Sequence, residues 1–202
     1  MTVDATAAFW ELFRQRQVGL ARAASADEPP YDELLECLQR VDPGLYLEFG
    51  CDSTGCDLII TAEGEQALFP LVRAVVAAAP TIPGWTIHAL KPKTGFPSTV
   101  HWHGYALDVA AVVFEPLDRN DSEQLDLHLF VPGLDPKDVS DAHNAALRAM
   151  DSGLGEQGLA EAVRGTKVRP LPQGATSEDF IPLVDLDAFI EWRKRKLTGG
   201  SP

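Results

Sequence analysis

Two histidines separated by one residue form the clearest chemical pattern in the chain. His101 and His103 flank Trp102 in a stretch that is expected to be extended, and residues two apart on a strand point to the same side. Both imidazoles could therefore bind one zinc ion, with His128 or Asp108 as a third ligand. A metal-bound water would then serve a metal-dependent hydrolase. Histidine pairs on strands are common, however, and the third ligand has no characteristic spacing.

Other catalytic patterns are incomplete. The sequence contains no Gly-x-Ser-x-Gly elbow and no glycine-rich phosphate loop that ends in Lys-Ser or Lys-Thr. Cys51 beside a histidine could supply a thiolate nucleophile, but nothing in the sequence places the two together. Cys51 and Cys56 flank a turn, where a reduced pair is expected, and two thiols alone are a weak metal pattern. We expect no catalytic residue and no cofactor, and the sequence leans against an enzyme.

Aromatic and acidic side chains point instead to protein binding. Trp102 and Tyr105 lie near a loop that carries Phe96 between Gly95 and Pro97, which predicts an exposed aromatic ring. Exposed aromatic side chains are typical anchors of protein interfaces. The predicted partner-binding residues are the aromatics and carboxylates Phe96, Trp102, Tyr105, Asp118, Asp121, Glu123, Asp138 and Asp141.

The charge is strongly acidic and unevenly distributed. The formal net charge is -13, and the segment from Val100 to Ala160 has eleven acidic and three basic residues. Such a field repels nucleic acid and anionic membranes and attracts a basic protein, although it also serves solubility alone. We expect a basic protein partner, no nucleic acid and no membrane.

Composition predicts a cytoplasmic protein with a substantial core. The chain has 202 residues, of which 45% are hydrophobic, and three cysteines. A core of this size needs no disulfides. No apolar run is long enough to span a bilayer, and the first residues lack the basic region of a signal peptide.

An amphipathic helix is predicted from Asp4 to Ala24. Its aromatic residues Phe9, Trp10 and Phe13 recur at helical spacing and are expected to pack on the same domain. A homodimer through this helix is the alternative. A second helix is predicted from Tyr31 to Val41.

The block from Leu45 to Lys93 predicts strand, turn, strand, helix and strand. Leu45–Gly50 alternates between apolar and polar residues, and the turn at Asp52–Gly55 predicts that Leu58–Ala62 returns as the second strand of a hairpin. The next helix should begin near residues 65–68, so that Pro70 lies in its first turn, where a missing N–H costs little. Thr86–Leu90 is the third strand.

The remaining chain completes an α+β fold. Extended segments are predicted at residues 99–103, 111–117, 125–131 and 166–171, and helices at 135–151 and 185–197, with the first of these ended by Gly153, Gly155 and Gly158. We predict a mainly antiparallel sheet of about five to seven strands with helices packed against it, plus the added N-terminal helix. A doubly wound parallel sheet is the second choice. The expected divisions are an N-terminal helix and break at 1–30, one domain at 31–197 and a frayed tail at 198–202.

Several short segments also resemble an uncharacterised family of bacterial cytosolic proteins. The segments include Leu45–Gly50, Leu58–Gly64, Pro83-Gly84-Trp85 and, later, Leu127–Gly133 and Pro170–Pro172. The resemblance covers most of the chain after Leu45. It implies no catalytic residues, and it suggests an immunity or accessory protein of a toxin or secretion system.

Overall fold

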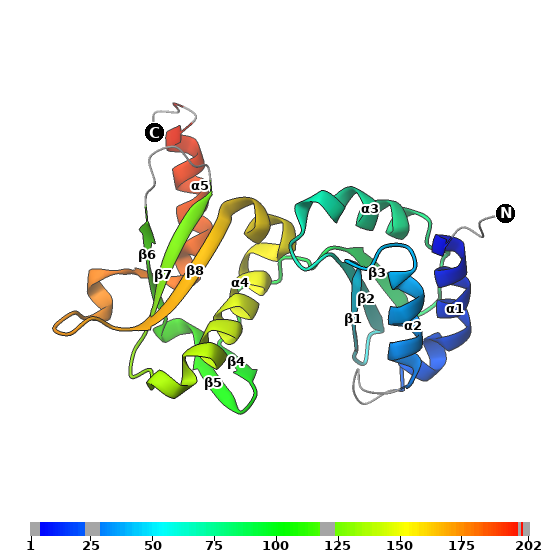
Figure 1. The fold of residues 1–202 in the computed structure, drawn as a ribbon, viewed down its shortest axis with the longest axis horizontal. Coiled ribbons are helices and arrows are strands. Elements are labelled where there is room, and N and C mark those ends of the chain that lie inside the picture. The colour runs from blue at the N-terminus through cyan, green and yellow to red at the C-terminus, as the bar shows by residue number, and fades with distance from the viewer. Residues whose placement is uncertain (1–4, 23–28, 118–123, 198, 200–202) are drawn as a thin grey trace. The chain divides into compact units, whose positions relative to one another are not determined.

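The chain has the expected α+β fold and divides into two compact units, Met1–Pro92 and Lys93–Pro202. The structure is a computed structural model that describes residues 5–22, 29–117, 124–197 and 199 (Figure 1). One domain was predicted at 31–197, after a separate N-terminal helix and break at 1–30. The division between the compact units follows Pro92, because the N-terminal helix packs inside the first unit and the chain after Pro92 packs on elements of the second.

The described residues of the first unit form three α-helices and a three-stranded sheet in the order β1-β2-β3. Strands β1 and β2 are antiparallel, whereas β2 and β3 are parallel and are connected through α3. Pro70 occupies the first turn of α3, as predicted. The elements are α1 (Ala5–Leu20), α2 (Pro29–Gln39), β1 (Tyr46–Cys51), β2 (Cys56–Thr61), α3 (Phe69–Ala77) and β3 (Trp85–Ala89).

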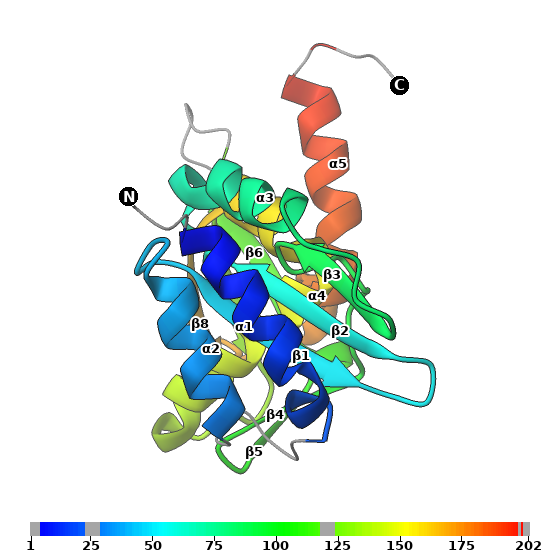
Figure 2. The same cartoon turned by 90° about the vertical axis from the view of Figure 1, so that its right-hand side faces the viewer.

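The apolar stripe of α1 is part of the core of the first unit. Phe9, Trp10 and Phe13 are almost completely buried, and each such side chain contributes about 1.5–3 kcal/mol when it leaves water. The Trp10 indole N–H donates to the carbonyl oxygen of Val75 in α3 at 2.9 Å. Figure 2 shows α1 and α2 lying across the sheet. The stripe that could have formed a homodimer is therefore covered by its own unit.

The second unit contains a hairpin, a four-stranded sheet and two helices. The hairpin pairs β4 with β5, and the sheet has the order β8-β7-β6-β9, with β7 and β8 parallel. A single sheet of five to seven strands was expected, but the described strands form three separate sheets. The elements are β4 (Thr99–Trp102), β5 (Tyr105–Asp108), β6 (Val113–Leu117), β7 (Leu125–Val131), α4 (Val139–Ala162), β8 (Val163–Pro170), β9 (Ile181–Pro182) and α5 (Leu186–Leu197).

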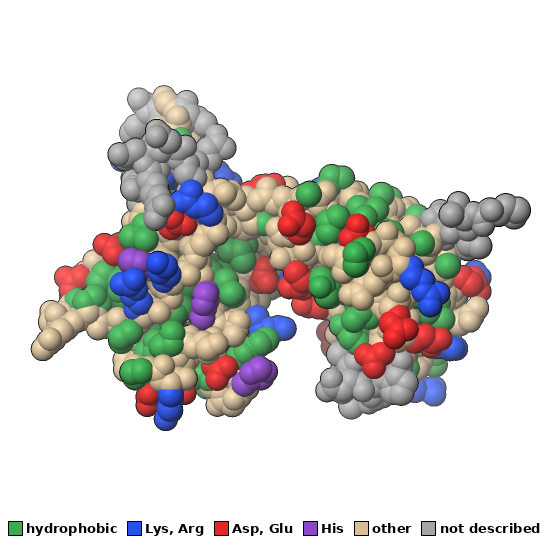
Figure 3. All heavy atoms as spheres, viewed as in Figure 1, with side chains coloured by type: hydrophobic (Ala, Val, Ile, Leu, Met, Phe, Trp, Pro, Cys, Tyr) green, Lys and Arg blue, Asp and Glu red, His purple; other side chains and the backbone are tan. Residues whose placement is uncertain are grey.

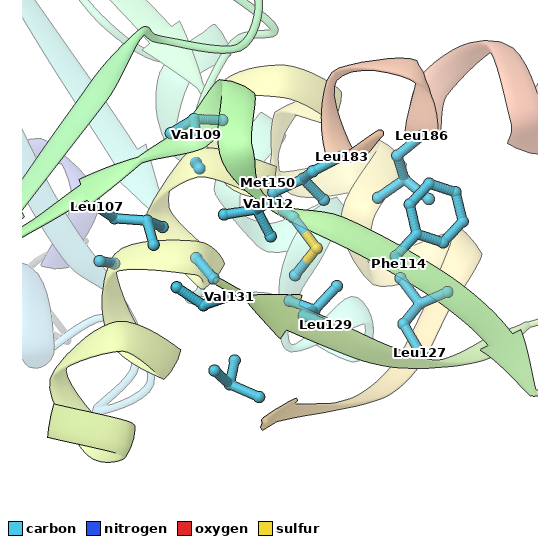
Figure 4. Close-up of a cluster of buried hydrophobic side chains, with 14 of the residues drawn as sticks. Leu107, Val109, Val112, Phe114, Leu127, Leu129, Val131, Met150, Leu183 and Leu186 are labelled. Atoms are coloured by element: carbon cyan, nitrogen blue, oxygen red, sulfur yellow. The ribbon is translucent and has the colours of Figure 1, made fainter. Parts of the chain in front are cut away.

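Helix α4 covers one face of the four-stranded sheet. Its buried side chains are mostly small, including Ala142, Ala146 and Ala149, which allow the helix and sheet to approach closely. Figure 4 shows Met150 between Val112 and Leu129. The predicted break at the glycines is confirmed at Gly155, whose φ of 73° and ψ of 156° are not helical. A second helical segment continues beyond this kink to Ala162, which the sequence did not predict.

The two units repeat one strand–strand–helix–strand motif. Glu48 of β1 pairs with Ile59 of β2, and at the matching place Glu115 of β6 pairs with His128 of β7. In both copies a glycine with positive φ follows the second strand, Gly64 at 86° and Gly133 at 68°. An acidic residue then caps a 3-10 turn before the helix; these caps are Glu65 and Asp135.

The core positions of the two motifs also correspond. Matched by strand register, the inward residues of the first motif are as buried as those of the second. The pairs are Leu45 with Val112, Leu47 with Phe114, Leu58 with Leu127, and Ile60 with Leu129. The two units therefore bury corresponding positions of their first two motif strands in the same way.

The loop before the hairpin is fixed to α4. The backbone N–H groups of Thr94 and Gly95 donate to the carbonyl oxygen of Ser152 at 2.9 and 3.0 Å. The ring of Phe96 lies directly over Gly153, where a Cβ atom would overlap it. The absence of a side chain at Gly153 thus makes room for the Phe96 ring.

Replacing Gly153 with alanine should lower the free energy of unfolding by about 1–3 kcal/mol, because the methyl group collides with the Phe96 ring. Chemical denaturation measures this loss. The matched control is Gly158→Ala in the same helix, where the nearest atom to the new Cβ is 3.7 Å away. That substitution should stabilise the protein by about 0.5–1 kcal/mol. In a Phe96→Ala background the Gly153→Ala penalty should largely disappear; an unchanged penalty would contradict the assigned contact.

Candidate functional site

The β4–β5 hairpin packs against α4 and presents two aromatic side chains there. Trp102 and Tyr105 are paired across the end of the hairpin, and both are half-buried. The guanidinium carbon of Arg148 in α4 lies 5.0 Å from the centre of the Trp102 ring, a cation–π contact. The ring of His103 is 4.9 Å from that of Trp102. The Arg148 guanidinium therefore holds the Trp102 ring, and with it the end of the hairpin, to α4.

Two carboxylates from the beginning of α4 lie beside these aromatic residues. Asp135 caps the turn that leads into α4, and Asp138 and Asp141 follow, where the positive end of the helix dipole favours negative charge. Nδ1 of His103 is 3.7 Å from a carboxylate oxygen of Asp141. Burial, and to a smaller extent the charge of Asp138, raises the pKa of Tyr105.

We call Trp102, His103, Tyr105, Asp138 and Asp141 the hairpin–helix surface. Four of these five residues were predicted partner-binding residues, and the structure brings them together from two separate segments of the chain. Figure 3 shows acidic, basic and hydrophobic side chains interspersed on the exposed surface of the second unit. The arrangement offers aromatic area next to carboxylates, which suits recognition of a basic protein surface.

The other predicted partner-binding residues do not join this surface. Phe96 was expected to be an exposed anchor, but its ring is half-buried over Gly153 and supports the fold. The sequence could not show this, because the contact depends on a glycine in a distant helix. Asp118, Asp121 and Glu123 lie outside the described residues.

The histidines proposed as metal ligands are not brought together with a third ligand. His103 lies in the turn after β4 with φ of 46°, so the strand alternation that would align it with His101 ends before it. His128 belongs to the other sheet, where its Nδ1 is 3.8 Å from Glu115. Among the described residues, no group of three or more His, Cys, Asp or Glu side chains could hold a metal ion. The geometry therefore lends no support to the zinc-dependent alternative.

Cys51 and Cys56 form a disulfide at the tip of the β1–β2 hairpin. They are directly opposite in the register, and their Cα atoms are only 4.0 Å apart. The backbone N–H of Cys56 donates to Gly84 of the neighbouring segment, so this pair is the type in which side chains approach most closely. A reduced pair was expected; the exact cross-strand register, which a turn pattern alone leaves open, allows the bond.

The contacts of Arg148 and His103 were not predicted from the sequence. Arg148 reaches Trp102 from α4, a contact between distant segments that no local pattern indicates. His103 contacts Trp102, its neighbour in the chain, and lies near Asp141 of α4. None of the described helices is long and apolar enough to cross a membrane.

The phenol of Tyr105 should ionise above its ordinary pKa of about 10, because burial and Asp138 disfavour the phenolate. A raised folded-state pKa favours the protonated form, so this contribution to stability is present below about pH 10 and is lost as the pH rises further. Ultraviolet titration of the wild type against Tyr105→Phe isolates this group. Asp138→Asn should lower the pKa only in part, since burial is the larger cause; a full return to the ordinary value would contradict this order.

Comparison with known proteins gives no family assignment: no protein-family model, curated protein sequence or solved structure matches the chain.

Proposed function

We propose that the protein is a non-enzymatic binding module that uses the hairpin–helix surface to recognise a basic region of a partner protein. The supporting observation is the gathering of Trp102 and Tyr105 with Asp138 and Asp141 on one surface. Two half-buried aromatic rings supply contact area, and two carboxylates supply complementary charge.

The contributions of these groups differ in kind. Aromatic side chains at the centre of an interface carry much of the binding energy, whereas partly exposed carboxylates chiefly set the association rate and the salt dependence. The side chain of Asp141 is 35% exposed, so solvent screens its charge only in part. The net charge of -13 adds a long-range attraction for a basic partner that weakens as salt increases.

An immunity or accessory role in a bacterial toxin or secretion system is the concrete form of this proposal. Its support is the resemblance of the segments between Leu45 and Pro172 to bacterial cytosolic proteins of that kind. A cytoplasmic site of action belongs to the same proposal. In a reducing cytoplasm the Cys51–Cys56 bond would open, whereas the hairpin–helix surface contains no cysteine.

The double variant Asp138→Asn/Asp141→Asn should weaken capture of the natural partner by about fivefold, because it removes two complementary charges worth up to about 1 kcal/mol in total. The measurement is affinity capture from a lysate of the source cells at low and high salt. Captured proteins are identified by mass spectrometry and their binding to purified variants is then quantified.

The matched control is Glu178→Gln/Asp185→Asn, which removes the same charge from two exposed residues of the second unit outside the hairpin–helix surface. It should leave binding within about twofold of the wild type, since only the long-range field changes. Equal losses in the two double variants would show that net charge alone governs binding. If the affinity capture recovers no protein whose binding depends on salt, the proposed binding function is wrong.

A further inference from the structure

The two copies of the repeated motif differ at one sheet edge. In the second unit the outer edge of β6 is covered by β9, which pairs antiparallel with it: Phe114 lies opposite Ile181 and Val113 opposite Pro182. The backbone N–H of Leu183 also donates to the carbonyl oxygen of Val112 at 2.9 Å. In the first unit β1 and β3 are the two terminal strands, and no described strand pairs with the outer edge of β1, the strand that corresponds to β6.

Backbone groups on the outer edge of β1 match those that β9 uses on β6. When the two motifs are aligned by their strand register, Leu47 corresponds to Phe114 and Leu45 to Val112. In an antiparallel pair, alternate residues direct both backbone groups to the same side. The backbone N–H and C=O groups of Leu47 therefore face the outer edge, as those of Phe114 do, and so do the backbone groups of Phe49.

A side chain already occupies part of this edge. The hydroxyl of Tyr31 in α2 donates to the carbonyl oxygen of Leu47 at 3.2 Å. The ring of Tyr31 lies 6.2 Å from that of Phe49, so the side chain follows the strand. The hydroxyl satisfies an acceptor that a neighbouring strand would otherwise satisfy with a backbone N–H.

The surroundings of the β1 edge are negative. Burial raises the pKa of Tyr31, and the carboxylates Glu48, Asp32 and Glu63 raise it further. Lys91 forms ion pairs with Glu48 at 3.3 Å and with Glu63 at 3.0 Å and offsets part of this charge, so that three carboxylates stand against one lysine here. An extended segment that pairs with β1 would meet carboxylates, which basic side chains complement.

We infer that the outer edge of β1 binds an extended basic segment of a partner protein, which adds as an antiparallel strand at Leu47 as β9 does at Phe114. Strand addition of this kind obtains affinity from backbone hydrogen bonds and specificity from side chains. Tyr46, which is 39% exposed on β1, would offer a ring to the incoming strand. This surface is separate from the hairpin–helix surface and does not depend on it.

The outer edge of β8 in the second unit, with which no further described strand pairs, is a poorer candidate for such a segment. Strand β8 carries Arg164, which pairs with Asp126, together with Lys167 and Arg169, and it has no acidic residue. Positive side chains along an edge are a common protection against strand pairing, and they repel a basic segment. The charge of β8 thus disfavours a basic strand at this edge.

The test uses the full-length protein and a synthetic peptide of alternating lysine and valine, as long as the six residues of β1. Its binding is measured by fluorescence anisotropy, and its location by amide hydrogen exchange. The inference predicts saturable binding that slows exchange at Leu47 and Phe49. A peptide of alternating glutamate and valine should bind at least about tenfold more weakly, because its charge is unfavourable.

Two variants with opposite expected effects, and a third that serves as their control, sharpen the test. Glu48→Gln should weaken binding of the basic peptide about two- to fivefold through loss of one partly exposed charge. Glu115→Gln, the equivalent position beside the edge that β9 already covers, should have no effect. Tyr31→Phe frees the Leu47 carbonyl and should tighten binding by about two- to tenfold.

Three results would overturn the inference. They are undetectable binding of the basic peptide, slowed exchange on β3 or β8 in place of β1, and equal losses in Glu48→Gln and Glu115→Gln. Circular dichroism and denaturation of each variant confirm that the compared proteins are folded. Loss of the proposed partner interaction in Asp138→Asn/Asp141→Asn would leave this test unaffected, since those residues belong to the other unit.

Discussion

Close packing of α4 on the four-stranded sheet is the contact on which the second unit depends. Small side chains such as Ala142, Ala145 and Ala149 bring the helix near the strands, and larger sheet residues fill the space between them. A well-packed interior tolerates neither added volume nor voids. The helix is therefore held in a defined position, where it receives the Phe96 ring at Gly153 and the β4–β5 hairpin. The hairpin–helix surface exists because one helix serves both the core and the hairpin.

The first unit solves the same physical problem with different residues. Its parallel pair β2 and β3 requires a crossover, and α3 supplies it while covering the sheet. A sheet of three strands has little area to bury, and α1 and α2 add the apolar surface that α3 alone lacks. In the second unit the longer α4, with α5, performs this role. The repeated motif fixes the strand register, whereas the added elements determine which edges and faces stay open.

The elements outside the repeated motif account for the placement of the two proposed binding surfaces. One surface lies where the β4–β5 hairpin is added to α4. The other is the outer edge of β1, which no described strand covers, whereas β9 covers the same edge of β6. Core positions leave little freedom for binding, because their side chains are required for packing. Acidic side chains at both places act with the overall negative charge, so salt should weaken association at either surface.

Local patterns in the sequence determined most elements, including the β1–β2 hairpin, the start of α3 at Pro70 and the capped turn at Asp135, because turns, caps and amphipathic periods depend on neighbouring residues. They also predicted Trp102, Tyr105, Asp138 and Asp141 as partner-binding residues, and that role stays a prediction. The tertiary structure alone decided which strands pair, that the strands form three sheets, and that Phe96 packs over Gly153. Strand pairing and ring burial depend on residues far apart in the chain, and the alternation within one strand carries no record of its partner.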